Sequence, residues 1–260
     1  MKSSQDTQHQ TSFNVLLIGD SCIDKYNIGT VDRISPEAPV PVLKIIDTYE
    51  LPGMAANVNL NLINLNIEAD FVTNDSPVTK TRFIDERSGQ HLLRVDDEPT
   101  VPNWSGVTPF PIEEYDIIVI SDYNKGFLSD GQIYQVIRNS DCPIFIDTKK
   151  RDLSMFNQPN VFIKINELEY NNTTSIHDNL IVTLGSKGAM YNDQIYPTKK
   201  VEVMDVCGCG DTFMAALVTQ YLFTKDIEKA IIFANVAAGI TVQHRGNYAP
   251  TYDEIRIAGY

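Results

Sequence analysis

The chain has 260 residues and a formal net charge of −13, with 43% hydrophobic and 21% charged residues. This composition is that of one globular domain with a sizeable core, which we place at residues 13–260 after a polar tail at 1–12 that we expect to be disordered. The chain is acidic and has no cluster of lysine and arginine residues, which argues against a nucleic-acid-binding protein. The polar start lacks the apolar core of a signal peptide, and no run of about 20 apolar residues suggests a membrane span. The four cysteines have no zinc-site spacing, so we expect reduced thiols and a cytoplasmic protein.

Strands and helices alternate along the chain. Short apolar runs rich in valine and isoleucine predict buried parallel strands at 14–20, 116–122, 143–147, 161–166 and 180–184. Apolar residues at helical spacing predict helices at 54–65, 129–138, 211–223 and 226–243. This order favours a three-layer α/β/α sandwich around a mostly parallel sheet. Residues 40–51 and 81–95 predict strands of a small separate sheet, and the four prolines within 98–113 predict a loop.

A glycine-rich loop, Gly208-Cys209-Gly210-Asp211, comes directly before a long apolar helix. Backbone N–H groups and the helix dipole would make this loop an anion site. Asp211 is either the N-cap of the helix or a general base that takes a proton from a hydroxyl group. The chain lacks the phosphate-loop, protein-kinase and dinucleotide-binding motifs, so other nucleotide-binding classes are excluded.

Two motifs carry a family resemblance. Asp205-Val-Cys-Gly-Cys-Gly-Asp-Thr-Phe213 resembles the signature of the ribokinase-like carbohydrate kinases, and Pro52-Gly-Met-Ala-Ala-Asn57 resembles their sugar-binding signature. Within that family, residues 33–44, 121–126 and 233–239 are similar to the kinase domain of bacterial ADP-heptose synthases. The resemblance covers about residues 14–249. It implies a ribokinase-like fold with a β-sheet lid at about 30–51 and 80–96. It also implies ATP-dependent phosphorylation of D-glycero-β-D-manno-heptose 7-phosphate at O1.

The chain departs from the subfamily pattern in a few places. Met54 stands where a second glycine is usual, and Cys207 and Cys209 replace a threonine and an alanine of the anion loop. A strand–helix unit expected after Asp70 is missing, and residues up to 260 leave no room for a nucleotidyltransferase domain. A separate nucleotidyltransferase is therefore an expected partner in the pathway.

The resemblance assigns roles around the sugar. Asp211 becomes the base, and Gly208, Cys209 and Gly210 supply the anion-binding N–H groups. Asp24 and Asn57 hold sugar hydroxyl groups, with Gly53 allowing close approach of the backbone. The alternatives are a turn aspartate and a helix-capping asparagine. Four cations are candidates for the substrate phosphate or, alternatively, ordinary surface charges: Lys80, Arg82, Arg94 and Lys125.

The resemblance also assigns the nucleotide side. Asn166 and Glu169 would arrange Mg²⁺ through water, or simply form a solvated acidic helix start. In some relatives the position of Asp205 serves a monovalent cation, so K⁺ is a further expected cofactor. The ATP groove would be lined by Thr183, Gly185, Gly188, Asn235 and Gly239. The alternatives are a β-hairpin turn at 183–188 and a structural Asn235.

The sequence also bears on metal binding by histidine, on the oligomeric state and on rival functions. The four histidines (His9, His91, His177 and His244) have no metal-binding spacing, and we assign them no chemistry. Exposed lid strands need a partner, which predicts a homodimer through the lid. Two rival functions stay open: a kinase for another sugar, sugar phosphate or nucleoside, and a non-catalytic binding protein of the same fold.

Overall fold

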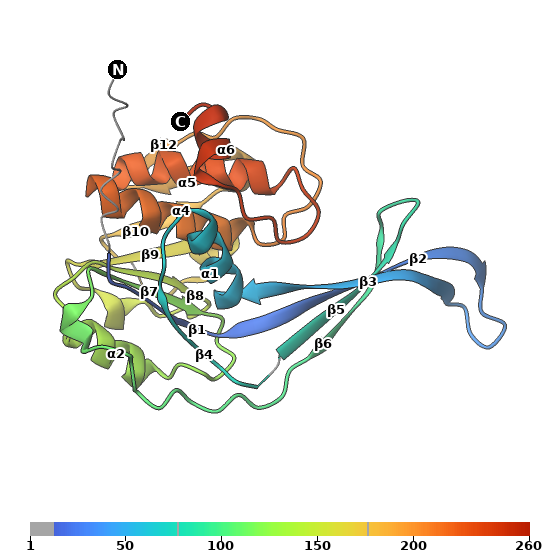
Figure 1. Ribbon diagram of the computed structural model, residues 1–260, viewed down its shortest axis with the longest axis horizontal. Helices are drawn as coiled ribbons and strands as arrows, with labels where there is room; N and C mark the ends of the chain where they lie inside the picture. The colour runs from blue at the N-terminus through green and yellow to red at the C-terminus, as the bar shows by residue number, and fades with distance from the viewer. Residues whose placement is uncertain (1–12, 77, 176) are drawn as a thin grey trace, which may run out of the picture.

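A computed structural model describes residues 13–260 except Pro77 and Ile176, so the expected disordered tail at 1–12 lies outside the described residues. The body is built on an eight-stranded sheet in the order β12-β11-β10-β9-β8-β7-β1-β4 (Figure 1). From β10 to β4 all strands are parallel, and β11 and β12 add an antiparallel edge. The strands are β1 (Val15–Gly19), β4 (Asp70–Thr73), β7 (Ile117–Asp122), β8 (Ile144–Thr148), β9 (Val161–Asn166), β10 (Leu180–Thr183), β11 (Ala189–Tyr191) and β12 (Gln194–Tyr196).

Helices and loops cover both faces of this sheet. Alternate strand residues such as Leu17 and Val119 pack under α1 (Ala55–Asn64), α4 (Cys209–Thr224), α5 (Ile227–Thr241) and α6 (Tyr252–Ile257). The intervening residues, such as Ile18 and Ile120, pack on the other face against α2 (Asp130–Arg138) and a loop anchored by Trp104. A further short helix, α3 (Glu167–Asn172), follows β9, and 3₁₀ turns occupy Ile112–Glu114, Ser154–Phe156 and Gly185–Lys187. The expected three-layer sandwich is confirmed, because continuous apolar strands need cover on both sides.

A second, four-stranded sheet projects from the body (Figure 1). Its order is β3-β2-β5-β6, with β2 (Ser21–Ile34), β3 (Pro41–Met54), β5 (Val78–Asp85) and β6 (His91–Asp97). We call this sheet the lid. The single strand expected at 81–95 is wrong. A turn intervenes because the Asp85 carboxylate accepts from the Ser88 N–H and hydroxyl at 3.0 and 2.7 Å, and Gly89 adopts a φ of 68°. The lid also starts earlier than expected, at Ser21, because β2 leaves the body directly after β1.

The two faces of the lid differ in chemistry. Cross-strand partners point to the same side, so Arg82 and Arg94 share one face with Asp24 and Lys80. The alternate positions form the opposite face, where Phe83 pairs with Leu93. Leu93 and Val95 are 56% and 46% exposed, which is unusual for large apolar side chains on a strand. The polar face is the one that reaches the body, where Asp24 accepts a hydrogen bond from the Asn247 amide.

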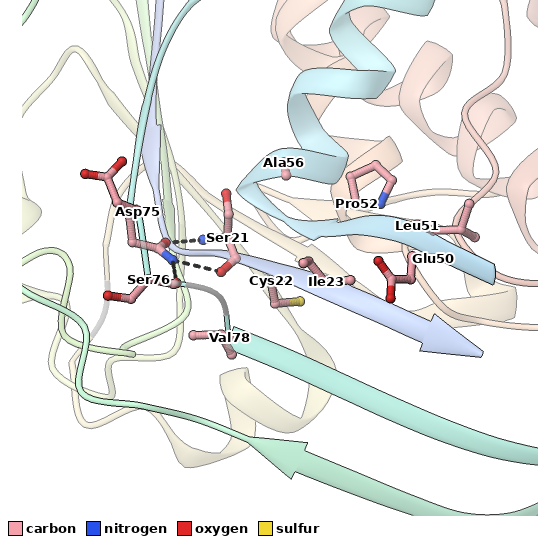
Figure 2. A pocket seen from close by; sticks show the side chains of 11 residues that line it. Ser21, Cys22, Ile23, Glu50, Leu51, Pro52, Ala56, Asp75, Ser76 and Val78 are labelled. Carbon is pink, nitrogen blue, oxygen red and sulfur yellow. Dashed lines mark hydrogen bonds between the residues drawn. The ribbon is translucent and has the colours of Figure 1, made fainter. Parts of the chain in front are cut away.

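The connection after β4 differs from the sequence expectation. The strand expected to be missing is present as β4, paired in parallel with β1, and only the helix is absent. Because β4 is short and half-buried at the sheet edge, it carries no apolar run that would reveal it. The turn that replaces the helix is fixed by Asn74, whose carbonyl oxygen accepts from the Ser21 N–H at 2.7 Å. A pocket of about 430 Å³ lies beside this turn, at the root of the lid and the start of α1 (Figure 2).

Met54 has a backbone conformation that glycine adopts more readily than other residues. It ends β3, precedes α1 and adopts φ 58° and ψ −132°. This region of backbone space strongly favours glycine, so a methionine here holds local strain of order 1–3 kcal/mol. The strain lies where the lid joins the body, and the buried Met54 side chain packs in the core beneath it.

Candidate active site

Asp211 lies in the first turn of α4, buried to 4% exposure. Its Oδ2 accepts from the Asn57 amide at 2.9 Å, and its Oδ1 accepts from the Tyr123 hydroxyl at 2.7 Å. Burial raises the pKa of the Asp211 carboxyl to about 6, and the two hydrogen bonds act against that rise. A carboxylate with a pKa near neutrality is suited to accept a proton at physiological pH.

The N-cap alternative for Asp211 is wrong. The N-cap of α4 is Gly208, with φ 71°, and Asp211 bonds side chains instead of helix N–H groups. The capping alternative for Asn57 is wrong too, because α1 is preceded by Met54 and the Asn57 amide reaches Asp211. Asn61 holds Asn57 in place by donating to its backbone carbonyl and its side-chain oxygen at 2.8 and 3.2 Å. The Asp211 carboxylate and the Asn57 amide therefore form one prearranged pair between α1 and α4.

The anion loop is closely packed. A Cβ on Gly208 would lie 2.6 Å from the Asn57 amide nitrogen and 2.8 Å from the Asn247 side-chain oxygen, so only glycine fits. A Cβ on Gly210 would lie 3.0 Å from the Lys164 ammonium, which pairs with Asp147 at 2.5 Å. Lys164 is buried and was not foreseen from the sequence, because a lysine inside a strand carries no motif. It adds a positive charge beside the loop, as an anion site requires.

The thiols beside this loop are kept neutral. Burial raises the pKa of Cys207 to about 11 and also raises that of Cys209. Their side chains therefore add no negative charge to an anion site.

Asp24 joins the lid to the body. It lies in β2, so the turn alternative is wrong. Its Oδ1 accepts from Arg82 at 2.6 Å in a buried ion pair, and its Oδ2 accepts from the Asn247 amide at 2.8 Å. Asn247 also donates to the Pro52 carbonyl at 2.7 Å, a contact that no sequence motif indicated. A Cβ on Gly53 would overlap the Asp24 carboxylate, which accounts for the glycine.

The four expected phosphate-binding cations have different surroundings. Arg82 is buried on Asp24, with its guanidinium 5.1 Å from the centre of the Tyr26 ring. Arg94 pairs with Asp96 through two hydrogen bonds of 2.7 and 2.6 Å on the polar lid face, and Lys125 pairs with Glu98 at 2.6 Å. Lys80 lies 5.6 Å from the centre of the Tyr123 ring, beside the base. Lys80 is therefore the cation best placed to meet a substrate near Asp211.

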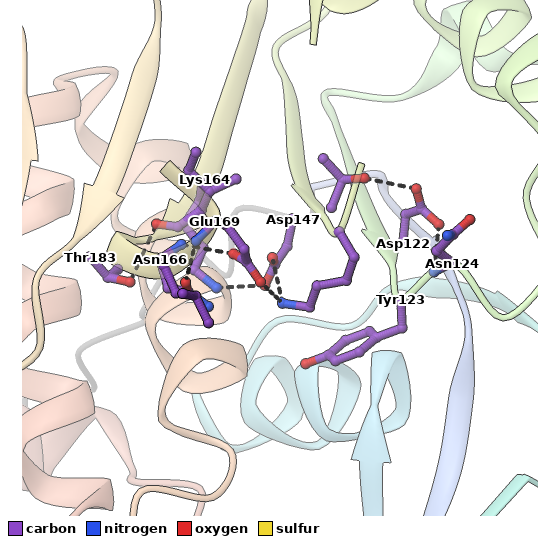
Figure 3. Close-up of polar contacts among 12 residues, drawn as sticks. Asp122, Tyr123, Asn124, Asp147, Lys164, Asn166, Glu169 and Thr183 are labelled. Atoms are coloured by element: carbon purple, nitrogen blue, oxygen red, sulfur yellow. Dashed lines mark hydrogen bonds and ion pairs between the residues drawn. The ribbon is translucent and has the colours of Figure 1, made fainter. Parts of the chain in front are cut away.

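Asn166 and Glu169 form a capping box at the start of α3, with reciprocal bonds of 2.8 and 2.9 Å (Figure 3). The remaining Glu169 oxygen accepts from Lys149 at 2.5 Å. Nearby Asp147 has a buried oxygen, Oδ1, without a hydrogen-bond partner. In the part of the chain that the structure describes, no three His, Cys, Asp or Glu side chains form a ready-made metal site. This single oxygen lies 3.9 Å from the Lys149 ammonium, and a carboxylate oxygen completed by waters is a coordination that fits Mg²⁺.

Lys149 was not foreseen either. Burial acts to lower its pKa, but Asp147 and Glu169 outweigh that effect and hold the pKa above its usual value. Its charge links β8, α3 and the ring of Tyr123, whose centre is 5.0 Å from the ammonium.

The expected nucleotide residues lie on the β10–β11 side of the sheet. The hairpin alternative is confirmed, since Gly185–Lys187 is a 3₁₀ turn joining β10 to antiparallel β11. Gly188 has φ 98°, and a Cβ there would overlap the Tyr196 carbonyl. The Asn235 amide donates to that same carbonyl at 2.8 Å, so its structural role is confirmed. The nucleotide-binding roles of Thr183, Gly185, Gly188, Asn235 and Gly239 stay predictions.

Asp205 holds two loops together. Its carboxylate oxygens accept from the Cys207 and Gly246 N–H groups, each at 2.9 Å. Burial acts to raise its pKa, but these backbone bonds prevail and hold the pKa below its usual value. The carboxylate is therefore charged and oriented, and its role toward a monovalent cation stays a prediction.

Comparisons with known proteins show similarity to carbohydrate kinases. Residues 153–254 match the model of the pfkB family carbohydrate kinases. The chain is 32% identical to the bifunctional protein HldE of Histophilus somni over 92% of its own length and 62% of that protein. The chain is thus similar to the pfkB family of carbohydrate kinases. The chain spans about three fifths of the HldE relatives that it matches.

Solved structures support the fold. Arabidopsis thaliana ribokinase complexed with ribose and ATP has a TM-score of 0.71 at 14% identity, over 96% of this chain and 99% of that one. Escherichia coli phosphofructokinase-2 in complex with potassium has a TM-score of 0.70 at 15% identity, over 95% and 98%. The ribokinase-like fold is thereby confirmed. Together with the match to the pfkB family model, the fold makes the chain similar to carbohydrate kinases, phosphotransferases that act on an alcohol group.

Within residues 13–260, Pro77 and Ile176 apart, no helix has the length and apolar character needed to cross a bilayer.

Proposed function

We propose that the chain is an ATP-dependent kinase that phosphorylates D-glycero-β-D-manno-heptose 7-phosphate at O1. The observation that carries the chemistry is the buried Asp211, held by Asn57 at the start of α4 and joined through the anion loop to the lid residue Asp24. The similarity of residues 33–44 and 121–126 to heptose kinase domains, and the HldE relatives, support the substrate. The product would be the 1,7-bisphosphate, a precursor of ADP-heptose.

The mechanism is in-line transfer of a phosphoryl group. Asp211 takes the proton of the sugar hydroxyl, because its pKa of about 6 leaves it ionised yet basic at neutral pH. The N–H groups of Gly208, Cys209 and Gly210 stabilise charge on the transferred group, with the helix dipole of α4 behind them. Lys164 reinforces that positive potential.

The sugar lies between the polar lid face and the body. Asp24 and Asn57 bind its hydroxyl groups, and Lys80, helped by Arg82, Arg94 or Lys125 after rearrangement, meets its phosphate. ATP lies along the β10–β11 edge near Thr183 and Asn235. Mg²⁺, held through water near Asn166, Glu169 and Asp147, would neutralise phosphate charge when bound. Asp205 is proposed to serve a monovalent cation such as K⁺.

The proposed enzyme is a cytoplasmic homodimer that works with a separate nucleotidyltransferase. The exposed apolar lid face supports a homodimer through the lid. The four thiols, Cys22, Cys142, Cys207 and Cys209, are free, which agrees with a reducing cytoplasm. A separate nucleotidyltransferase would use the product.

A coupled assay of ADP release tests the proposal. Wild type and Asp211→Asn are compared with Mg-ATP and heptose 7-phosphate, fructose 6-phosphate, ribose or adenosine. We expect turnover with the heptose phosphate, and a loss of about 10²–10⁴-fold in the variant, the usual contribution of a general base. Asp141→Asn, at an exposed aspartate in the connection between α2 and β8, is the matched control and should keep full activity.

Other outcomes discriminate among the alternatives. Turnover with a different acceptor would keep the base and replace the substrate. No turnover with any acceptor, in a folded protein that binds ATP, would favour a binding protein and overturn the proposed kinase.

A further inference from the structure

Tyr123 is the second side chain that bonds the base, and no sequence motif assigned it chemistry. Its hydroxyl donates to Asp211 Oδ1 at 2.7 Å. Tyr123 lies in the loop that follows β7 (Figure 3). That loop is firmly held. The Asp20 carboxylate accepts from the Tyr123 and Phe127 N–H groups at 2.8 and 3.2 Å, and Asp122 accepts from the Asn124 N–H at 2.9 Å. The phenol is therefore aimed at the base by a fixed backbone.

The ring of Tyr123 also lies near two ammonium groups from different elements. Lys149, at the end of β8, is 5.0 Å from the ring centre, and Lys80, on lid strand β5, is 5.6 Å away. Both distances allow a cation–π attraction. One side chain thus contacts the lid, the region proposed for Mg²⁺ and the base.

We propose that Tyr123 is a positioning residue that orients the Asp211 carboxylate toward the acceptor hydroxyl and keeps it ionised within its buried site. This inference rests on the proposed kinase function. Asp211 is 4% exposed, and the phenol and Asn57 are the side chains that bond its carboxylate among the described residues. Loss of the phenol therefore leaves a buried carboxylate oxygen without its protein donor, which disfavours the charged form. Two bonds from different elements fix the carboxylate plane, whereas one would leave it free to rotate.

Other charges bear on the same carboxylate and set the expected direction. Asp147 raises its pKa and Lys164 lowers it, while burial is the largest effect. Further titratable groups whose charges interact with Asp211 come from β2, the loop after β7, β8 and α4: Cys22, Tyr123, Lys149 and Cys209. Burial raises the pKa values of the two thiols and the phenol above their usual range, so these groups do not produce the acid limb.

The decisive variant is Tyr123→Phe, which keeps the ring and removes the hydroxyl. A hydrogen bond to a charged group corresponds to roughly one pH unit, so the acid limb of kcat/KM should move upward by about that much. Below pH 6 the variant should lose about tenfold relative to wild type. Above pH 8 the remaining loss should fall on kcat, with KM for the sugar unchanged, because the base is misaligned but the sugar contacts persist.

Tyr115→Phe is the matched control. The Tyr115 hydroxyl donates to a different carboxylate, Asp70, at 2.9 Å, on β4 and away from the base. It should lower stability like any buried tyrosine without moving the pH profile. An equal shift in both variants, or an unmoved limb in Tyr123→Phe, would overturn the inference.

A readout independent of turnover separates this inference from the proposed function. The ¹³C resonance of the Asp211 carboxyl, identified by its absence in Asp211→Asn, is titrated in wild type and in Tyr123→Phe. We expect the same upward shift of about one unit. If that shift appears while no sugar is phosphorylated, the kinase proposal fails and the coupling of Tyr123 to Asp211 stands. If turnover is present but the resonance titrates identically in both proteins, the inference on Tyr123 is wrong.

Discussion

Replacing Asp211 by asparagine should stabilise the fold at neutral pH while removing activity. The pKa of Asp211 rises from 3.8 to about 6 on folding, because burial disfavours the charged carboxylate. The native state therefore holds a proton more tightly than the unfolded chain. Stability from this group is fully present below about pH 4 and is lost as the pH rises through 6. The shift of about 2 units corresponds to roughly 3 kcal/mol at pH 8.

The asparagine variant carries no such penalty. Its stability relative to wild type should increase between pH 4 and pH 7 and then level off, with up to roughly 3 kcal/mol in its favour. Rearranged bonds to Asn57 and Tyr123 subtract a pH-independent amount of about 1 kcal/mol. Urea unfolding of both proteins at pH 4.5, 6 and 8 measures the difference. A difference independent of pH, or one that favours wild type more at pH 8 than at pH 4.5, would refute the reasoning.

Two further perturbations test the lid. Asp24→Ala leaves Arg82 buried without its anion and should lower the unfolding free energy by about 3–5 kcal/mol. Asp96→Ala, in the more exposed pair with Arg94, should lower it by under about 1 kcal/mol. Urea unfolding measures both values. Similar losses for the two would show that the Asp24 pair is not buried in solution. Leu93→Lys should convert the proposed dimer to monomer in sedimentation velocity, while Ile257→Lys, at an 80% exposed position on α6, should not. A wild type that is already monomeric at tens of micromolar would contradict the lid interface.

The sequence indicated the sheet and the base for different physical reasons. Buried parallel strands such as β7 are continuous apolar runs, so their positions came within a residue or two of the structure. Asp211 followed from the glycines before α4, since an anion loop has a strong local signature. The strands β4, β11 and β12, which lie at or next to the two edges of the sheet, were missed because they are only three or four residues long.

The site partners were harder to foresee than the base. Three of these partners bond to residues far away in the sequence: Lys149, Lys164 and Asn247. A lone lysine in or beside a strand, or an asparagine in a loop, belongs to no local sequence pattern that would predict such a contact. The opposite also occurred. Asn166 and Asn235 match family motifs, yet each makes a structural hydrogen bond: Asn166 caps α3, and Asn235 bonds the Tyr196 carbonyl.

The length of β2 has a mechanical consequence. The strand has 14 residues, and Asp24 is the fourth from its root at Ser21. At about 3.3 Å per residue, Asp24 lies roughly 10 Å from that root and the far end at Ile34 roughly 43 Å from it. If the lid tilts as a rigid body about its root, a displacement of about 1 Å at Asp24 becomes about 4 Å at the far end. The lid is then a lever with a gain of about four, and a fluorescent probe near Ile34 would report small shifts at the sugar as large ones.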